Sequence, residues 1–174
     1  MSTVSRKICL IGDFGVGKTS LIRRFVDRQF SDKYLSTVGV KISRKTLELA
    51  DSEKPKNLTL QLLIWDIEGS SKFKGISASY FQGAKGAILV GDVTRRESLE
   101  NIAEHLQAFL KANPQGKAVI ALNKSDLIDA EYLEKYRQLY SFSDDSSFVE
   151  TYASSAKTGI NVDNIFQSLA NSII

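Results

Sequence analysis

The segment IGDFGVGKTS, residues 11–20, is the most informative part of the sequence, and it contains three glycines, Gly12, Gly15 and Gly17. Glycine tolerates backbone conformations that side chains forbid, so the chain can curl with successive N–H groups pointing inward. Such a concave row of donors attracts anions. Four residues separate the first glycine from the last, and Lys18 and Thr19 follow, which is the P-loop spacing. In that pattern the lysine neutralises the outer phosphates and the Thr19 hydroxyl ligates Mg²⁺.

The segments on either side of this loop fit a strand, loop and helix unit. RKICLI, residues 6–11, is a short apolar and β-branched run that predicts a buried strand. SLIRRFV, residues 20–26, has apolar residues at helical spacing. The N-terminus of that helix would add its dipole and free N–H groups to a phosphate site. For the loop taken alone, a Gly-rich turn followed by a lysine remains the alternative.

Length and composition fit a single domain spanning residues 1–174. The chain is 43% hydrophobic and 25% charged, which provides for an ample core. Its net charge of +3 is small and its basic residues are scattered, so we expect no nucleic-acid partner. The pairs Arg23-Arg24 and Arg95-Arg96 are interpreted as solvated helix faces.

The sequence favours a cytoplasmic protein. Cys9 stands alone in the first apolar strand, which excludes a disulfide framework and predicts core packing in a reducing compartment. The start MSTVSRK has no apolar signal region, and no apolar run approaches a membrane span. The chain ends in NSII, without the cysteine that prenylation needs, so we expect no membrane anchor in it. Whether a lipidated tail has been trimmed is left open.

Apolar runs and helical periodicity alternate along the rest of the chain. Strands are expected at residues 40–50, 58–65, 87–93, 117–123 and 147–153, and helices at 96–113, 131–140 and 161–174. The first two of these strands are close enough in sequence to pair antiparallel. Strands that alternate with helices imply a mainly parallel, doubly wound sheet, in which ligands bind beyond the carboxyl ends of the strands.

Polar segments follow the predicted strands at those ends, including NKSD at residues 123–126 and SSAKTG at 154–159. Guanine presents two adjacent donors, and the Asp126 carboxylate can accept both, whereas adenine cannot supply them. Asn123 is suited to tying this loop to the phosphate loop, and the Lys124 stem to covering one face of the base. The Ala156 N–H can donate to guanine O6. Alone, NKSD also fits an ordinary Asn/Asp turn.

GDFGVGKT, a threonine after the first helix, WDIEG, NKSD and SAK together resemble the small GTPases of the Ras superfamily in order and spacing. The segments STVGVKI, residues 36–42, and WDIEGSSKFKGISASYFQGAKGAILVGDVTRRESLENI, residues 65–102, look most like the Rab branch. The resemblance covers essentially the whole chain. It implies an α/β fold, the P-loop NTPase G domain, with a doubly wound, mostly parallel six-stranded sheet, one antiparallel strand and about five helices. It also implies GTP or GDP and Mg²⁺ as cofactors.

The resemblance assigns roles to residues at each motif. Phe30 would stack on guanine and Tyr34 would flank the phosphates; alone, both read as loop aromatics at a core edge. Thr37 would complete the Mg²⁺ shell when a γ-phosphate is present, Asp66 would hold the metal through water, and the Gly69 N–H would sense the γ-phosphate. The metal set is then Thr19, Thr37 and Asp66. The nucleotide set is Gly12, Asp13, Phe14, Gly15, Val16, Gly17, Lys18, Thr19, Ser20, Phe30, Tyr34, Thr37, Asp66, Gly69, Asn123, Lys124, Asp126, Leu127, Ser155, Ala156 and Lys157.

Three residues depart from the family pattern where hydrolysis would occur. Ser70 replaces the usual Gln that orients the attacking water, and it is too short for that task. Glu68 replaces a small Ala, and its carboxylate points away, substitutes for the Gln or biases the loop by repulsion. Phe14 replaces Gly or Ser and would crowd an activator's arginine. The expected catalytic set is Lys18, Glu68, Gly69 and Ser70, and we expect slow hydrolysis and a poor response to arginine-finger activators.

The sequence therefore favours a molecular switch, expected to be a monomer, that meets effectors, an exchange factor and possible activating proteins through the loops around Thr37 and Gly69. In the runner-up reading, the chain is a constitutively GTP-loaded binding module with little or no hydrolysis. In a third interpretation, Phe14, Glu68 and Ser70 are neutral sequence drift in a GTPase whose partner supplies the missing groups. An ATP-using kinase is disfavoured because no adenine reader is present. His105 is interpreted as a surface residue without catalytic use.

Overall fold

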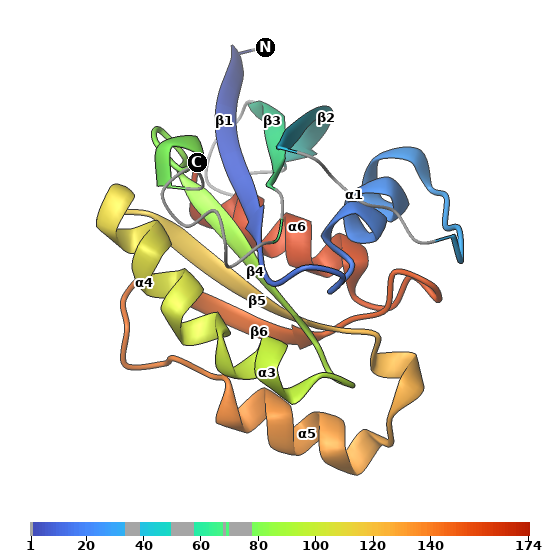
Figure 1. The fold of residues 1–174 in the computed structure, drawn as a ribbon. Helices are drawn as coiled ribbons and strands as arrows, with labels where there is room; N and C mark the ends of the chain where they lie inside the picture. Colours follow the sequence, from blue (N-terminus) through green and yellow to red (C-terminus); the bar gives the residue numbers. More distant parts are fainter. Residues whose placement is uncertain (1, 34–38, 50–57, 68, 70–77) are drawn as a thin grey trace.

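The computed structural model describes residues 2–33, 39–49, 58–67, 69 and 78–174 (Figure 1). Six strands form one sheet in the order β2-β3-β1-β4-β5-β6. Only β2 and β3 pair antiparallel, and every other neighbouring pair in the sheet is parallel. The strands are β1 (Ser2–Ile11), β2 (Val40–Leu49), β3 (Leu58–Ile67), β4 (Gly86–Asp92), β5 (Lys117–Asn123) and β6 (Phe148–Ala153). The predicted fold class is confirmed, including the single antiparallel strand.

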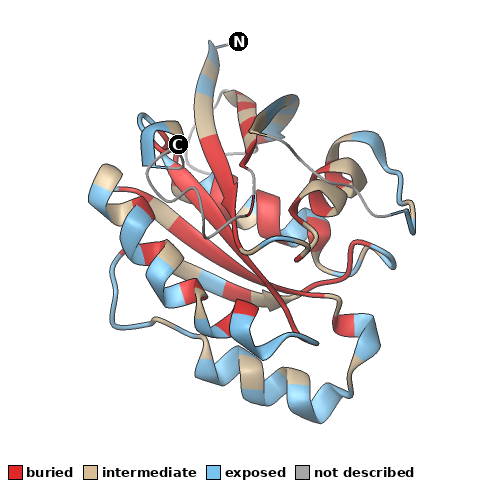
Figure 2. Cartoon of the chain, in the orientation of Figure 1, coloured by how far each residue is buried: buried red, intermediate tan, exposed pale blue. Residues whose placement is uncertain are grey.

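Helices cover both faces of this sheet. Helices α1 (Lys18–Asp27) and α6 (Val162–Ser172) lie on one face, where the rings of Phe25 and Phe166 stack with centroids 4.0 Å apart. The other face carries α3 (Arg96–Glu100), α4 (Ile102–Ala112) and α5 (Ala130–Leu139). The central strands are therefore enclosed, and all of β4 is buried (Figure 2). This enclosure explains why β4 reads as a continuous apolar run in the sequence.

The helix predicted at residues 96–113 is wrong in one respect, because a turn at Asn101 divides it into α3 and α4. Backbone hydrogen bonds still run through the turn, from Asn101 N to Glu97 O and from His105 N to Asn101 O. Asparagine is a weak helix former, and its side chain here donates to Asp13 on another element. Among the described residues, none of the helices combines the length and apolar character needed to cross a membrane.

Cys9 lies fully buried in β1, as predicted for a core residue. Burial raises the pKa of its thiol to about 12, although the charge of Lys7 opposes the shift. A pKa this high reduces the reactive thiolate about a thousandfold relative to an ordinary cysteine. We expect the native protein to resist iodoacetamide near pH 8 and the chain to label quickly in concentrated guanidinium chloride. Mass spectrometry of both samples checks this, and comparable labelling in the two would contradict the buried position.

Candidate functional site

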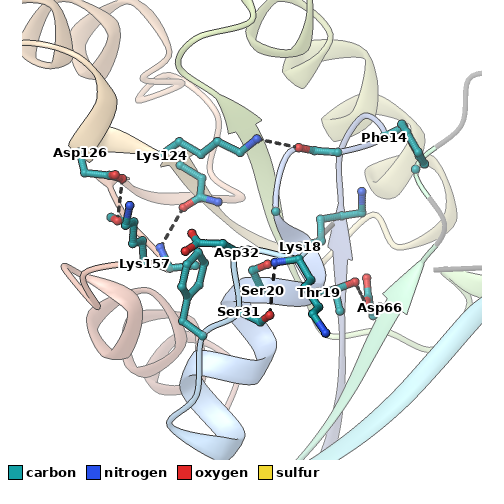
Figure 3. Close-up of a pocket in the computed structure, with 18 of the residues that line it drawn as sticks. Phe14, Lys18, Thr19, Ser20, Ser31, Asp32, Asp66, Lys124, Asp126 and Lys157 are labelled. Carbon is teal, nitrogen blue, oxygen red and sulfur yellow. Dashed lines mark hydrogen bonds between the residues drawn. The ribbon is translucent and has the colours of Figure 1, made fainter. Parts of the chain in front are cut away.

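The carboxyl ends of the strands meet around a cavity of about 360 Å³ (Figure 3). The structure brings most of the predicted site residues to its wall: Phe14, Gly15, Gly17, Lys18, Thr19, Ser20, Phe30, Asp66, Gly69, Asn123, Lys124, Asp126, Leu127, Ser155, Ala156 and Lys157. The lining comes from at least five separate segments of the chain. Their convergence is what a doubly wound sheet produces at the carboxyl ends of its strands.

The glycine-rich loop connects β1 to α1 along one side of the cavity. Gly15 and Gly17 adopt the left-handed region, with φ of 76° and 101°, which favours glycine. Gly17 is the N-cap of α1 and has no side chain with which to cap the helix. The start of α1 therefore receives no side-chain cap from this position, and the helix dipole favours an anion there.

Lys18 places a buried amine at the phosphate side of the cavity. Its side chain is 6% exposed, and Nζ donates to the carbonyl oxygens of Gly12 and Asp13 at 2.9 and 3.0 Å. Burial lowers its pKa to about 8, against the charges of Asp66 and Asp13. A Cβ on Gly69 would lie 2.5 Å from Lys18 Nζ and 2.7 Å from Gly12 O, so only glycine fits there. Bound phosphate would restore a full counter-charge to this amine.

Two side chains with oxygen atoms that suit a metal ion, Thr19 at the start of α1 and Asp66 near the end of β3, lie in contact. Thr19 Oγ1 donates a 2.5 Å hydrogen bond to Asp66 Oδ2, and Asp66 is 2% exposed at the end of β3. A hydroxyl beside a carboxylate matches the hard oxygen ligands that Mg²⁺ takes alongside water and phosphate. The described residues hold no cluster of three or more His, Cys, Asp and Glu side chains. Among the described residues, Thr19 and Asp66 would hold a metal here together with oxygen ligands from the substrate and water, while the predicted ligand Thr37 lies outside those residues.

Asn123 joins the far end of the cavity to the glycine-rich loop. Its Nδ2 donates to Val16 O at 2.9 Å, and its Oδ1 accepts the Ala156 N–H at 3.4 Å. Ser155 Oγ donates to Asp126 Oδ1 at 2.8 Å, which fixes that carboxylate at the cavity edge (Figure 3). The loops that carry NKSD and SAK are thus connected to each other and to the phosphate loop.

Arg24 corrects the interpretation of the Arg23-Arg24 pair as a solvated face. From α1, its Nε donates to Ala156 O at 2.8 Å, and its Nη2 donates to Lys157 O. The guanidinium therefore holds the SAK loop from behind. Nothing in the local sequence indicates this contact, because the two ends lie 132 residues apart in the chain.

Asp13 and Phe14 are held from the α3–α4 side. Asn101 Nδ2 donates to Asp13 Oδ2 at 2.7 Å, and His105 Nε2 lies 2.8 Å from Asp13 Oδ1. Burial acts to raise the pKa of Asp13, but the bonds from His105 and Asn101 outweigh it and leave that pKa below its ordinary value. Arg95 Nη1 donates to Phe14 O at 2.6 Å. The surface interpretations of His105 and Arg95 therefore missed their role in holding the loop.

The predicted and the observed site differ at several residues. Phe14 is 52% exposed and lines the cavity, whereas Gly12, Asp13 and Val16 are not among its lining residues. The predictions for Tyr34, Thr37, Glu68 and Ser70 fall outside the described residues. Sequence reasoning missed four lining residues, Ser31, Asp32, Lys33 and Ile67. Their proximity to Phe30 and to Asp66 in the chain was the available signal.

A glycine-rich loop placed between the first strand and first helix of such a sheet defines the class of P-loop nucleotide-binding proteins. Comparison with known proteins identifies the family within this class. The model of the Ras family matches residues 7–174. The chain belongs to the Ras family, and it is a Rab-like small GTPase.

Two relatives support the Rab-like assignment. The chain is 37% identical over 170 residues to "GTP-binding protein ypt1" of Schizosaccharomyces pombe, an alignment that covers 96% of this chain and 79% of that protein. It is also 37% identical over 170 residues to "Ras-related protein Rab-1A" of Dictyostelium discoideum, with the same two coverages. These relatives favour a GTP-hydrolysing switch over a constitutively loaded binding module.

Proposed function

We propose that the chain binds GTP or GDP with Mg²⁺ in this cavity, hydrolyses GTP slowly and signals the presence of the γ-phosphate through the loops around Thr37 and Gly69. One observation carries the proposal. Asn123 bonds to Val16 in the phosphate loop and to Ala156 in the SAK loop, so the elements that would read phosphate and guanine form one connected site.

Each end of the cavity supports a different part of the nucleotide. The loop N–H groups and the α1 N-terminus suit the phosphates, and Lys18 Nζ can exchange its two carbonyl acceptors for phosphate oxygens. Asp126 can accept the N1–H and N2–H of guanine, while the Ala156 N–H can share its long 3.4 Å bond to Asn123 Oδ1 with guanine O6. Thr19 and Asp66 would hold Mg²⁺, which supplies neutralisation of the phosphate charge.

The switch would depend on the contact between Gly69 and the phosphate loop. Gly69 lies against Gly12, Asp13 and Lys18, where its N–H can meet a γ-phosphate. Loss of that phosphate removes an anchor for the segment, which is the order-to-disorder change used by phosphate-sensing loops. Effectors would read the anchored state, and an exchange factor and possible activating proteins would act on the same loops.

The remaining features belong to the same proposal. We infer that residues 1–174 form one domain that works as a monomer. We also infer a cytoplasmic location, and the buried, free thiol of Cys9 suits a reducing compartment.

Slow hydrolysis rests on Ser70, which lacks the carboxamide that orients water in most relatives. We expect Ser70→Gln to accelerate single-turnover hydrolysis on the order of tenfold, since one positioned group is restored while Phe14 and Glu68 remain. The protein is loaded with GTP and Mg²⁺, and bound GTP and GDP are separated by chromatography over hours.

Ser143→Gln provides the matched control, because Ser143 is exposed in the loop after α5 and outside the cavity lining. It should hydrolyse GTP at the wild-type rate. If wild type already converts GTP at the ordinary rate of its relatives, another group positions the water. Glu68 would then be the next residue to replace.

A further inference from the structure

Asp92 carries a buried carboxylate at the end of β4, beside the cavity but outside its lining. Its side chain is 1% exposed. Oδ1 accepts hydrogen bonds from Thr94 N at 2.9 Å and Thr94 Oγ1 at 2.7 Å, and Oδ2 lies 2.8 Å from Lys124 Nζ. Burial acts to raise the pKa of Asp92, but the bonds from Lys124 and Thr94 outweigh it and leave that pKa below its ordinary value. The cation that neutralises this carboxylate therefore comes from NKSD.

Lys124 connects this carboxylate to the phosphate loop. Its Nζ also donates to Gly15 O at 3.0 Å, so two fixed acceptors hold the ammonium. Figure 3 shows the side chain extended across the cavity wall, from the Asp126 side toward the glycine-rich loop. The stem is thus held where it can cover one face of a bound base. A lysine without these acceptors would move among many rotamers, and ordering it on binding would cost entropy.

The sheet register explains why Asp92 is the residue that meets Lys124. Asp92 pairs with Asn123 across β4 and β5, which places its carboxylate next to the residue that follows Asn123. Ser98 in α3 fixes the Asp92 backbone, because its Oγ accepts from Asp92 N at 2.9 Å and donates to Asp92 O at 3.1 Å. Ser98 thus fixes the backbone of Asp92, and the two bonds from Thr94 orient its carboxylate toward Lys124. A buried charge costs stability unless it is paired in this way.

We propose that Asp92 is a positioning residue for the nucleotide: it holds Lys124 Nζ over the Gly15 carbonyl, keeps the lysine stem against the base and thereby slows nucleotide release. The inference rests on the proposed function, because it requires a guanine nucleotide in this cavity. Asp92 itself touches no part of the nucleotide in this arrangement and acts through Lys124.

The test measures release of a fluorescent N-methylanthraniloyl GDP, chased with excess GDP in the presence of Mg²⁺. Asp92→Asn keeps the shape of the side chain and an acceptor for Thr94, but removes the charge that holds Lys124. We expect release to accelerate about tenfold, the usual effect of losing one charge-assisted hydrogen bond. Thr94→Val is the matched control, because it removes one uncharged donor from the same carboxylate but leaves the charge of Asp92 and its ion pair with Lys124 in place. It should change the rate less than about threefold.

Lys124→Met tests whether Asp92 acts through the lysine, because methionine keeps an apolar stem and lacks the ammonium. If Asp92 acts through the lysine, Asp92→Asn adds no further acceleration in the Lys124→Met background. Equal acceleration by Asp92→Asn in both backgrounds would overturn the proposal, as would a wild-type rate in the single variant. Wild-type protein that fails to retain labelled GDP would instead contradict the proposed function.

A second measurement tests the proposal even if Lys124→Met does not fold. Inosine diphosphate lacks the 2-amino group that would donate a hydrogen bond to Asp126, but its base presents the same face to Lys124. Asp92→Asn should therefore accelerate the release of GDP and of inosine diphosphate by the same factor. A change in the ratio of the two rates would show that the variant displaces the Asp126 loop, and the positioning role would be wrong.

Discussion

Replacing Gly17 by alanine is expected to weaken GDP binding by about a hundredfold or more while the sheet remains folded. Gly17 has a φ of 101°, and an added Cβ would overlap Asn123 Nδ2. That amide donates to Val16 O at 2.9 Å and ties the NKSD loop to the phosphate loop. Left-handed backbone costs about 1–2 kcal/mol for alanine and lowers the stability of the free and the bound protein alike. The affinity falls because Asn123 is displaced: losing a buried hydrogen bond costs about 1–3 kcal/mol, and the upper end of that range corresponds to roughly two orders of magnitude.

Gly83→Ala separates this local effect from the general cost of alanine at positive φ. Gly83 has a φ of 76°, and an added Cβ would meet nothing within 4 Å. Both variants should lose some thermal stability, but only Gly17→Ala should lose nucleotide. Fluorescent GDP titration gives the affinities, and circular dichroism confirms that both variants fold. GDP affinity of Gly17→Ala within about threefold of wild type would contradict the assigned role of the glycine.

The order of strands and helices could be predicted because each depends on local patterns. Apolar runs in the central strands and the 3.6-residue period of the helices lie within short windows of sequence. The glycine-rich loop and NKSD were likewise visible as compact motifs. Asn101 shows the limit: its helical context was clear, but the turn there accompanies a bond to Asp13, 88 residues away in the chain.

The contacts that hold the site from behind could not be predicted from sequence. Arg24, Arg95 and His105 all looked like solvated residues, because isolated polar or basic side chains in or beside a helix usually are. Each instead reaches a loop of the site across 81 to 132 residues of chain. Only the register of the sheet and the packing of the helices bring these partners together. Spacing within a motif carries no information about them.

Asp126→Asn is expected to shift the base preference from guanine toward xanthine and to weaken the affinity for GDP by about a hundredfold to a thousandfold. Guanine offers two N–H donors to the carboxylate, whereas an amide offers one acceptor and one competing donor group. Losing hydrogen bonds to a charged group costs about 1.5–3 kcal/mol each. Ser155 Oγ donates to Asp126 Oδ1 at 2.8 Å, so it would hold the amide oxygen on its own side and leave the NH₂ facing the base.

Xanthine carries a carbonyl where guanine carries its 2-amino group, and that carbonyl can accept from the Asn amide. The variant should therefore bind xanthosine diphosphate more tightly than wild type does, as competition against fluorescent GDP can measure. Asp129→Asn is the matched control, because Asp129 is exposed at the start of α5, three residues away and outside the cavity lining. If Asp126→Asn weakened both nucleotides equally, the carboxylate would support the loop and would not read the base. Guanine selectivity would then depend on the Ala156 N–H. Arg24 holds that residue in place, because its Nε donates to Ala156 O at 2.8 Å.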